Sequence, residues 1–199
     1  MESRDQTVGS RIGMWLFLLS EILLFGGLFL IYAVYRAKNP ADFHAASLEL
    51  SRFDGTLNTA ILLTSSLTAV VAISSLQEKN NKRRAMLFLG ATIACGLAFL
   101  VVKAFEWTAK FEHGLYPNAP HLLGRPHGEQ LYFGLYFIMT GLHALHVIIG
   151  MTVLSVVLSF IARGKQTQER SASLENAGLY WHLVDIIWIF LFPLFYLIS

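Results

Sequence analysis

The chain has 199 residues, of which 55% are hydrophobic and 14% are charged, and its formal net charge at pH 7 is +2. The charged fraction lies well below the quarter that is typical of soluble domains, and the apolar residues are gathered into long runs, which excludes an ordinary soluble domain. The single cysteine excludes a disulfide framework and a thiolate metal cluster, and the small net charge gives no indication of a nucleic-acid partner.

Five apolar segments follow one another along the chain, each long enough to cross a membrane as a helix. The predicted fold is therefore an all-α membrane protein, a single transmembrane domain over residues 1–199 built as a bundle of five helices. The first apolar run is too long for a signal-peptide core and lacks a small-residue cleavage site, so we expect it to be retained. The spans are expected at about residues 12–35, 57–76, 85–110, 131–162 and 178–198.

The basic residues outside these segments are divided unequally between the two sides of the membrane. One side carries nine of them, in the N-terminal stretch and in the second and fourth connections, and the other side carries five. Because an excess of Lys and Arg marks cytoplasmic loops, the N-terminus is predicted to be cytoplasmic and the C-terminus to lie outside.

Ionisable residues inside the spans are candidate functional residues, because charge is costly in hydrocarbon. Lys103 and Glu106 are three residues apart near the outer end of the third span, which favours a local ion pair with Lys103 reaching towards the headgroups. His182 and Asp185 repeat this spacing on the fifth span. Their simplest interpretation is a carboxylate that orients an imidazole and ties the helix into the bundle, and the alternative is a proton-handling pair.

Glu21 differs from these residues because it has no basic residue three or four positions away. It must therefore be protonated or find a partner on another helix. At 1.5 Å per residue it lies about 14 Å into the first span, and His143 and His146 reach a similar depth on the oppositely directed fourth span. We therefore expect Glu21 to pair with His143 or His146.

The histidines inside the membrane do not form a recognisable ligand set. Two histidines three residues apart on one helix cannot occupy opposite axial positions of one haem, and only His182 remains as a partner from another span. The sequence has neither an HExxH zinc motif nor a CxxCH haem-attachment motif. We therefore expect no catalytic residue and no metal site in this chain.

Small residues recur at helical spacing on several spans and indicate close helix packing. The pattern includes Gly13, Ser20 and Gly27 on the first span and Gly90 on the third. It predicts that these two spans pack against each other through these residues.

Segments in all five spans together resemble subunit III of haem-copper terminal oxidases. The resemblance includes Glu21 in the first span, Glu106 in the third, His143 and His146 in the fourth, and His182 and Asp185 in the fifth. Longer members of that family have seven helices, and the five spans here resemble the bacterial form. The matching segments are RIGMWLFLLSEILLFGGLF from Arg11, LNTAILLTSSLT from Leu57, KAFEW from Lys103, GLHALHVIIG from Gly141 and NAGLYWHLVDIIWIFLF from Asn176.

The resemblance implies a non-redox subunit in the cytoplasmic membrane of a bacterium that respires with oxygen. Such a subunit packs on oxidase subunit I, assembles with subunit II and other respiratory subunits, supports stable proton uptake and binds phospholipid. Haem and copper are expected in the partner subunits and no cofactor in this chain. The histidines would then be structural hydrogen-bond partners rather than ligands, and the outer side of the membrane would be the periplasm. A structural or proton-related role is expected for the six matching polar residues, Glu21, Glu106, His143, His146, His182 and Asp185, with Glu21 near proton uptake.

Two other functions fit parts of the sequence. Lys103 stands where longer family members often have an uncharged residue, which indicates an alternative assignment as an accessory subunit of a nitric oxide reductase. A quinol-binding anchor of the cytochrome b type is the second alternative, and it would require haem in this chain. The sequence does not distinguish cytochrome c from quinol as the electron donor.

Overall fold

The computed structural model describes residues 2–77, 81–164 and 168–197, and these are helical apart from short connections. No strand occurs in these ranges. The helices are α1 Glu2–Lys38, α2 Pro40–Ser47, α3 Arg52–Gln77, α4 Lys82–Glu112, α5 Pro120–Leu123, α6 His127–Ala162 and α7 Gln168–Phe192, and α7 continues into the π-helical turn η1 Pro193–Leu197.

Five of these helices are long and apolar enough to cross a membrane, which confirms the predicted fold class. Four of the five crossing segments begin three to five residues earlier than predicted. In α3 and α6 the added residues include Asp54 and Glu129 in the first turn, and acidic residues suit a helix N-terminus. The segments are Ile12–Lys38, Arg52–Gln77, Lys82–Glu112, His127–Ala162 and Leu174–Leu197. Residue 198, the predicted end of the last span, lies outside the described residues.

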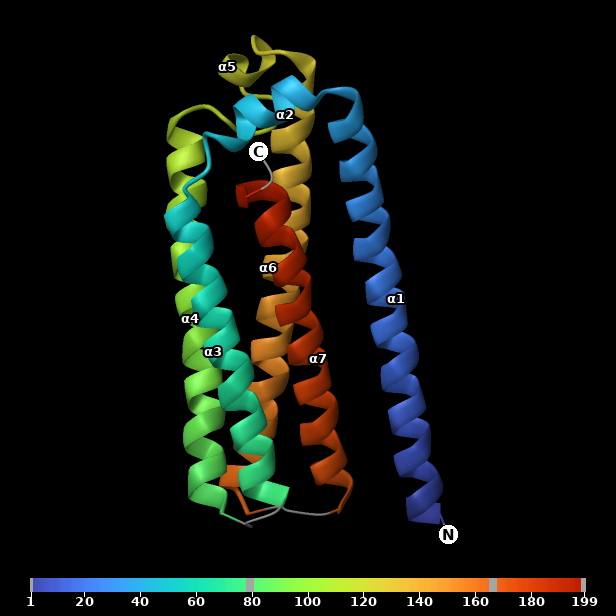
Figure 1. Ribbon diagram of the computed structural model, residues 1–199. Coiled ribbons are helices and arrows are strands. Elements are labelled where there is room, and N and C mark those ends of the chain that lie inside the picture. Colours follow the sequence, from blue (N-terminus) through green and yellow to red (C-terminus); the bar gives the residue numbers. More distant parts are fainter. Residues whose placement is uncertain (1, 78–80, 165–167, 198–199) are drawn as a thin grey trace.

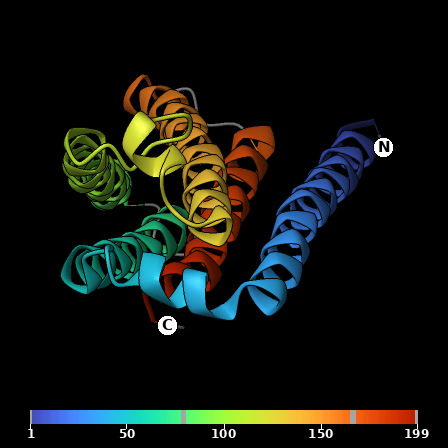
Figure 2. The same ribbon diagram turned by 90° about the horizontal axis from the view of Figure 1, so that it is seen from above.

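The helix α1 stands to one side of a compact group formed by the other four long helices. It contacts α2, α6 and α7, whereas α3 and α4 form a closely packed hairpin on the opposite side of the bundle. Towards its N-terminal end α1 leans away from its neighbours, as Figures 1 and 2 show. The chain ends lie at opposite ends of the bundle (Figure 1), as an odd number of spans requires.

Two short helices, α2 and α5, cover the end of the bundle where α6 begins (Figure 1), and both lie in segments that the sequence presents as loops. The helix α2 packs directly on α6. There the Gly128 backbone N–H donates a hydrogen bond to the Asp42 carboxylate at 3.1 Å. Proline at the first position of each short helix, Pro40 and Pro120, suits a helix start.

The C-terminal turn η1 is buried at the same end of the bundle. The Tyr32 hydroxyl of α1 donates to the Leu194 carbonyl at 2.5 Å, and the Tyr132 hydroxyl of α6 donates to the Phe195 carbonyl at 2.7 Å. These carbonyls belong to the last helical turn and therefore have no partner within their own helix. Two tyrosines from separate spans thus fix the end of α7 in the core.

The direction of insertion remains a prediction, and impermeant thiol labelling measures it. In a Cys95→Ser background, we expect Leu123→Cys, at the α5 end, to react with a membrane-impermeant maleimide added to intact cells. We expect Arg163→Cys, exposed at the opposite end, to react only after permeabilisation. The reverse pattern would contradict the cytoplasmic assignment of the N-terminus.

Candidate functional site: polar groups inside the helical bundle

Glu21 and His146 form a contact between α1 and α6, inside the membrane-spanning segments. The His146 Nε2 atom lies 2.9 Å from the Glu21 Oε2 atom, and the two side chains are 9% and 13% exposed. The ring packs edge-on against Phe25, with centroids 5.4 Å apart. The structure confirms that Glu21 finds a partner among the histidines of the fourth span and identifies that partner as His146.

The second ring nitrogen of His146, Nδ1, makes a hydrogen bond that fixes the orientation of the ring. The Nδ1 atom lies 2.7 Å from the Leu142 carbonyl oxygen, which can only accept a hydrogen bond, so Nδ1 carries a proton. The Nε2 atom is then the one that meets the Glu21 carboxyl, on the side of the ring that faces α1. The pair is therefore a directed polar contact between α1 and α6 inside the membrane-spanning segments.

His143 lies in the core and has no part in the Glu21 contact. It is fully buried, and neither ring nitrogen has a hydrogen-bond partner among the described residues. Its ring packs against Phe99 and Trp188, with centroids 5.4 and 5.3 Å away. Residues three apart on an α-helix differ by roughly 60° in direction, so His146 turns towards α1 while His143 turns into the bundle. The proposed alternative pairing of Glu21 with His143 is wrong.

Lys103 and Glu106 form a fully buried polar cluster together with Tyr136 and Tyr196. The Lys103 Nζ atom lies 3.0 Å from the Glu106 carboxylate and donates to the Tyr196 hydroxyl at 2.7 Å and to the Tyr136 hydroxyl at 3.2 Å. Both tyrosine hydroxyls donate onward to the Glu106 Oε1 atom, at 2.8 and 2.6 Å. The ammonium also lies 5.1 Å from the centroid of the Trp188 ring.

This geometry confirms the predicted ion pair and corrects the expected position of the lysine. Lys103 is 2% exposed, so its side chain does not reach the headgroups. It turns inward because two tyrosines and a carboxylate satisfy its three N–H donors there. The cluster joins α4, α6 and the C-terminal turn η1 through hydrogen bonds alone.

His182 and Asp185 do not pair with each other. The His182 Nδ1 atom lies 2.7 Å from the Ser66 hydroxyl of α3, and neither oxygen of the Asp185 carboxyl has a hydrogen-bond partner in the described part of the chain. The prediction that Asp185 orients His182 is therefore wrong. Ser66 takes that place because α3 and α7 pack side by side.

Two tryptophans reinforce the same contact between α3 and α7. The Trp181 indole N–H donates to the Ser65 hydroxyl and the Trp188 indole N–H donates to the Thr59 hydroxyl, both at 3.0 Å. Both indoles are fully buried. The hydroxyl-rich face of the second span is therefore the acceptor surface for the aromatic side chains of the fifth.

The four small residues of the predicted contact, Gly13, Ser20 and Gly27 on the first span and Gly90 on the third, have no close neighbour on another helix of the described part of the chain, so the prediction that they pack these spans together is wrong. A Cβ atom added at Gly13, Gly27 or Gly90 would meet nothing within 4 Å. Ser20 is exposed and donates only to the Phe17 carbonyl of its own helix, at 2.7 Å. Instead, α1 packs on α6 and α7 through larger side chains such as Phe25, which is 1% exposed.

Within the described residues, no group of three or more His, Cys, Asp or Glu side chains lies close enough together to hold a metal ion. A family model for cytochrome c oxidase subunit III matches residues 3–199. The chain belongs to the cytochrome c oxidase subunit III family. Its similarity to subunit 3 of Drosophila melanogaster amounts to 33% identity, over 96% of this chain and 70% of the fly protein.

Bacterial members of the subunit III family match a larger share of their own length. Subunit 3 of Alkalihalophilus pseudofirmus is 30% identical over 94% of this chain and 86% of that protein. Subunit 3 of Thermostichus vulcanus is 32% identical over 94% of this chain and 87% of that protein. These figures agree with the five spans found here, since the animal protein has a further segment that this chain does not match.

In this subunit III chain the backbones of two helices approach the Trp181 ring closely, at positions that the sequence does not reveal. A Cβ atom at Gly150 would lie 2.8 Å from that ring, and one at Gly96 would lie 2.9 Å from it. The ring therefore occupies a slot between α4 and α6 that only glycine leaves open. The isolated positions of these glycines in the sequence give no periodic signal, and only the tryptophan opposite them explains their role.

Gly150→Ala should lower the free energy of unfolding by about 1–3 kcal/mol, because the new methyl group overpacks a rigid indole. Gly134→Ala on the same helix is the matched control, since nothing lies within 4 Å of a Cβ atom there. The control should be neutral or slightly stabilising because alanine favours helix. Chemical denaturation of the purified chain, followed by tryptophan fluorescence, measures both. Equal stability of the two variants would contradict the conclusion that the Trp181 ring leaves room only for glycine at position 150.

Proposed function

We propose that this chain is the non-redox subunit III of a haem-copper terminal oxidase in a bacterial cytoplasmic membrane. In this role it packs on subunit I, assembles with subunit II and other respiratory subunits, supports stable proton uptake and binds phospholipid. Haem and copper belong to the partner subunits. The relatives that share most of its length carry the name cytochrome c oxidase subunit 3, which supports its place in such a complex.

The observation that carries the proton-related part of the proposal is the Glu21–His146 contact. A carboxyl and an imidazole inside a membrane span are costly unless they pair or act, and this pair lies between α1 and the rest of the bundle. The pair is 9–13% exposed rather than sealed, so water or a partner subunit can reach it. This access supports a role of the pair near the proton-uptake side of the complex.

The assignment as a non-redox subunit rests on what the buried histidines contact. His146 contacts Glu21 and a backbone carbonyl, His182 contacts Ser66, and His143 is enclosed by Phe99 and Trp188. None of these rings faces a second histidine across a haem-sized space. The outer surface of α1 supports assembly with a partner, since Trp15 and Leu23 are 62% and 68% exposed there.

A second candidate is the accessory subunit of a nitric oxide reductase, and Lys103 is the observation that favours it. This lysine is compensated by Glu106, Tyr136 and Tyr196, so it is an integral part of this chain's core. The partner enzyme then reduces nitric oxide in place of oxygen. In either case the chain itself carries no redox centre.

Purification of the tagged chain from its native membrane in a mild detergent tests the proposal. We expect a haem-copper subunit I to co-purify, together with haem absorption and oxygen consumption. After a harsher detergent separates the subunits, the isolated chain should show no Soret band. A Soret band that stays with the chain would indicate a cytochrome b-like anchor, and consumption of nitric oxide alone would indicate the reductase.

A further inference from the structure

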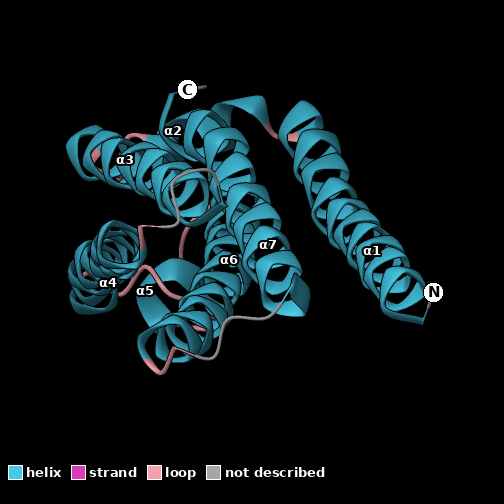
Figure 3. Ribbon diagram, turned by 90° about the horizontal axis from the view of Figure 1, so that it is seen from below, coloured by secondary structure: helices cyan, strands magenta, loops and turns pink. Residues whose placement is uncertain are grey.

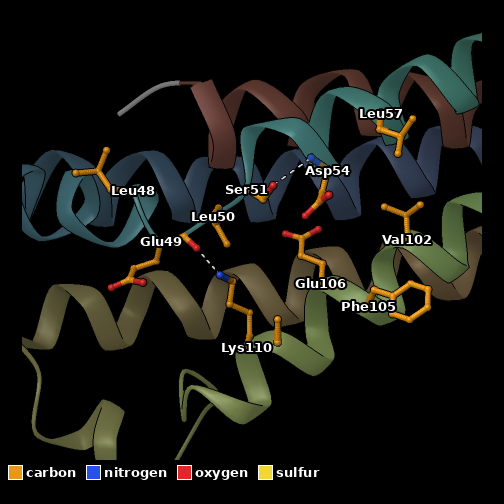
Figure 4. Close-up of a pocket in the computed structure, with 11 residues that line it drawn as sticks. Leu48, Glu49, Leu50, Ser51, Asp54, Leu57, Val102, Phe105, Glu106 and Lys110 are labelled. Atoms are coloured by element: carbon orange, nitrogen blue, oxygen red, sulfur yellow. Dashed lines mark hydrogen bonds between the residues drawn. The ribbon is translucent and has the colours of Figure 1, made fainter.

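A cavity of about 490 Å³ opens at the α2 end of the bundle, between the connection that precedes α3 and the last turns of α4. Figure 4 shows that its polar residues come from both sides, Glu49 and Asp54 from one and Glu106 and Lys110 from the other. This volume lies within the range of ligand sites in proteins. The cavity lies among α3 and α4, across the bundle from α1 (Figure 2).

Two of the charged groups in this cavity have an ionic partner elsewhere. The Glu106 carboxylate is paired with Lys103 at 3.0 Å, and the Glu49 carboxylate lies 3.3 Å from the Arg125 guanidinium. These carboxylates are therefore neutralised by cations of the chain itself. They form part of the cavity wall and leave little charge to attract a ligand.

The other two charged groups, Lys110 and Asp54, have no ionic partner among the described residues. The residue Lys110 is 9% exposed, and its ammonium donates to the Glu49 backbone carbonyl but lies within 4 Å of no described carboxylate. The partly buried Asp54 carboxylate accepts no hydrogen bond from any described residue, although its backbone N–H is bonded to Ser51. The Lys110 ammonium is attracted to the Asp54 carboxylate through space, but the two groups form no salt bridge, so each keeps room for a partner of its own.

Apart from Ser51, the remaining lining is apolar. Leu57, Val102 and Phe105 line the side of the cavity that continues along α3 and α4, and Phe105 is 73% exposed. Asp54 lies in the first turn of its membrane-spanning helix and Lys110 in the last turn of the neighbouring one. The polar part of the cavity is therefore at the depth of lipid headgroups, and the apolar part is at the depth of acyl chains.

We propose that this cavity binds the headgroup of a phospholipid with a primary amine, such as phosphatidylethanolamine. The phosphate of the lipid accepts hydrogen bonds from Lys110, and the ammonium of the lipid headgroup donates to Asp54. The first part of one acyl chain lies along Leu57, Val102 and Phe105. A zwitterion satisfies both unpaired charges at once, whereas a purely anionic headgroup would leave Asp54 without a partner. The inference deepens the proposed lipid-binding role by locating one site and its headgroup chemistry.

Native mass spectrometry of the full chain in detergent, with added lipids of identical acyl chains, tests the proposal. The lipids are phosphatidylethanolamine, phosphatidylcholine, whose trimethylated amine donates no hydrogen bond, and phosphatidylglycerol, which lacks the amine. We expect phosphatidylethanolamine to bind about tenfold more tightly than either, as one charge-assisted hydrogen bond allows. Asp54→Asn should abolish this preference, and Lys110→Gln should weaken the binding of all three lipids.

Glu112→Gln is the matched control, an exposed carboxylate on α4 outside the cavity, and it should leave the preference unchanged. Equal binding of the three lipids, or an unchanged preference in Asp54→Asn, would overturn the proposal. Equal binding of phosphatidylethanolamine and phosphatidylglycerol would reduce the site to a phosphate contact at Lys110 and would also overturn it. Co-purification with oxidase subunits is measured on the same variants. Loss of the lipid preference with normal co-purification concerns the lipid site alone, whereas failure of the unmodified chain to co-purify contradicts the proposed function.

Discussion

Replacing Lys103 with methionine should lower the free energy of unfolding by about 3–5 kcal/mol, because it leaves the Glu106 carboxylate buried without its cation. The side chain of Glu106 is 2% exposed and meets water only at the cavity wall, so water replaces the lost ammonium incompletely. Tyr136 and Tyr196 would keep their hydrogen bonds to the carboxylate but would not neutralise its charge. Denaturant unfolding of the purified chain, followed by tryptophan fluorescence near Trp188, measures the loss.

The double variant Lys103→Met with Glu106→Gln should recover much of this stability, since neither charge of the buried pair remains and the amide can still accept from the tyrosines. Lys38→Met is the matched control, because Lys38 is exposed at the end of α1 and should change stability little. A Lys103→Met protein as stable as the Lys38→Met protein would show that the ion pair contributes nothing to the native bundle.

The Glu21–His146 contact should appear as a coupling free energy between two helices. Glu21→Leu and His146→Leu should each destabilise the chain by about 1–3 kcal/mol, because each leaves a polar group in the span without its partner. The double variant should lose less than the sum of the two, since two leucines suit the apolar surroundings. A double-mutant cycle on the free energy of unfolding measures the difference, expected at about 0.5–3 kcal/mol.

His143 provides the control for this cycle. It lies three residues from His146 on α6 but makes no contact with Glu21, so Glu21→Leu and His143→Leu should have additive effects. His143→Leu alone should cost little, because the ring has no hydrogen bond to lose among the described residues. Coupling of Glu21 to His143 in place of His146 would contradict the side-chain placement described above.

The sequence predicts the spans and the partner helix of Glu21 because both depend only on the order of residues along the chain. Runs of apolar residues give the helices, and the rise per residue places Glu21 opposite the histidines of the fourth span. The choice between His143 and His146 depends on the rotation of α6 about its axis. The depth of a residue does not specify that rotation, and packing against α1 and α7 does.

The groups that surround Lys103 could not be predicted from its neighbours in the sequence. Its hydrogen-bond acceptors Tyr136 and Tyr196 lie 33 and 93 residues away. In the local sequence, lipid headgroups are the nearest polar groups to a lysine near a helix end. The expected result is therefore a Lys103 side chain that extends towards the headgroups. The buried site exists only because η1 brings Tyr196 back over α4. The partner of His182 could not be predicted for the same reason. The structure shows that this partner is Ser66 and not Asp185, and Ser66 is distant in the sequence.

The small-residue pattern failed for a different physical reason. A row of glycine and serine indicates that something approaches a helix closely, but it does not say whether that is a helix of the same chain, another subunit or lipid. Gly13 and Gly27 face away from this chain's own helices. Gly96 and Gly150, which no periodic pattern singles out, both face the ring of Trp181 closely.

The pairing of the first span with the last two has a consequence for biosynthesis. Proteins are made from the N-terminus, so α1 enters the membrane long before its partners exist. His146 follows Glu21 by 125 residues, and the carbonyl of Leu194 that holds Tyr32 follows it by 162. Until the ribosome has passed these positions, the first span must keep an acidic side chain in lipid or in the insertion machinery. The α3–α4 hairpin can form meanwhile, so the bundle is expected to close only after α6 and α7 have been synthesised, with the docking of α1 as the final step.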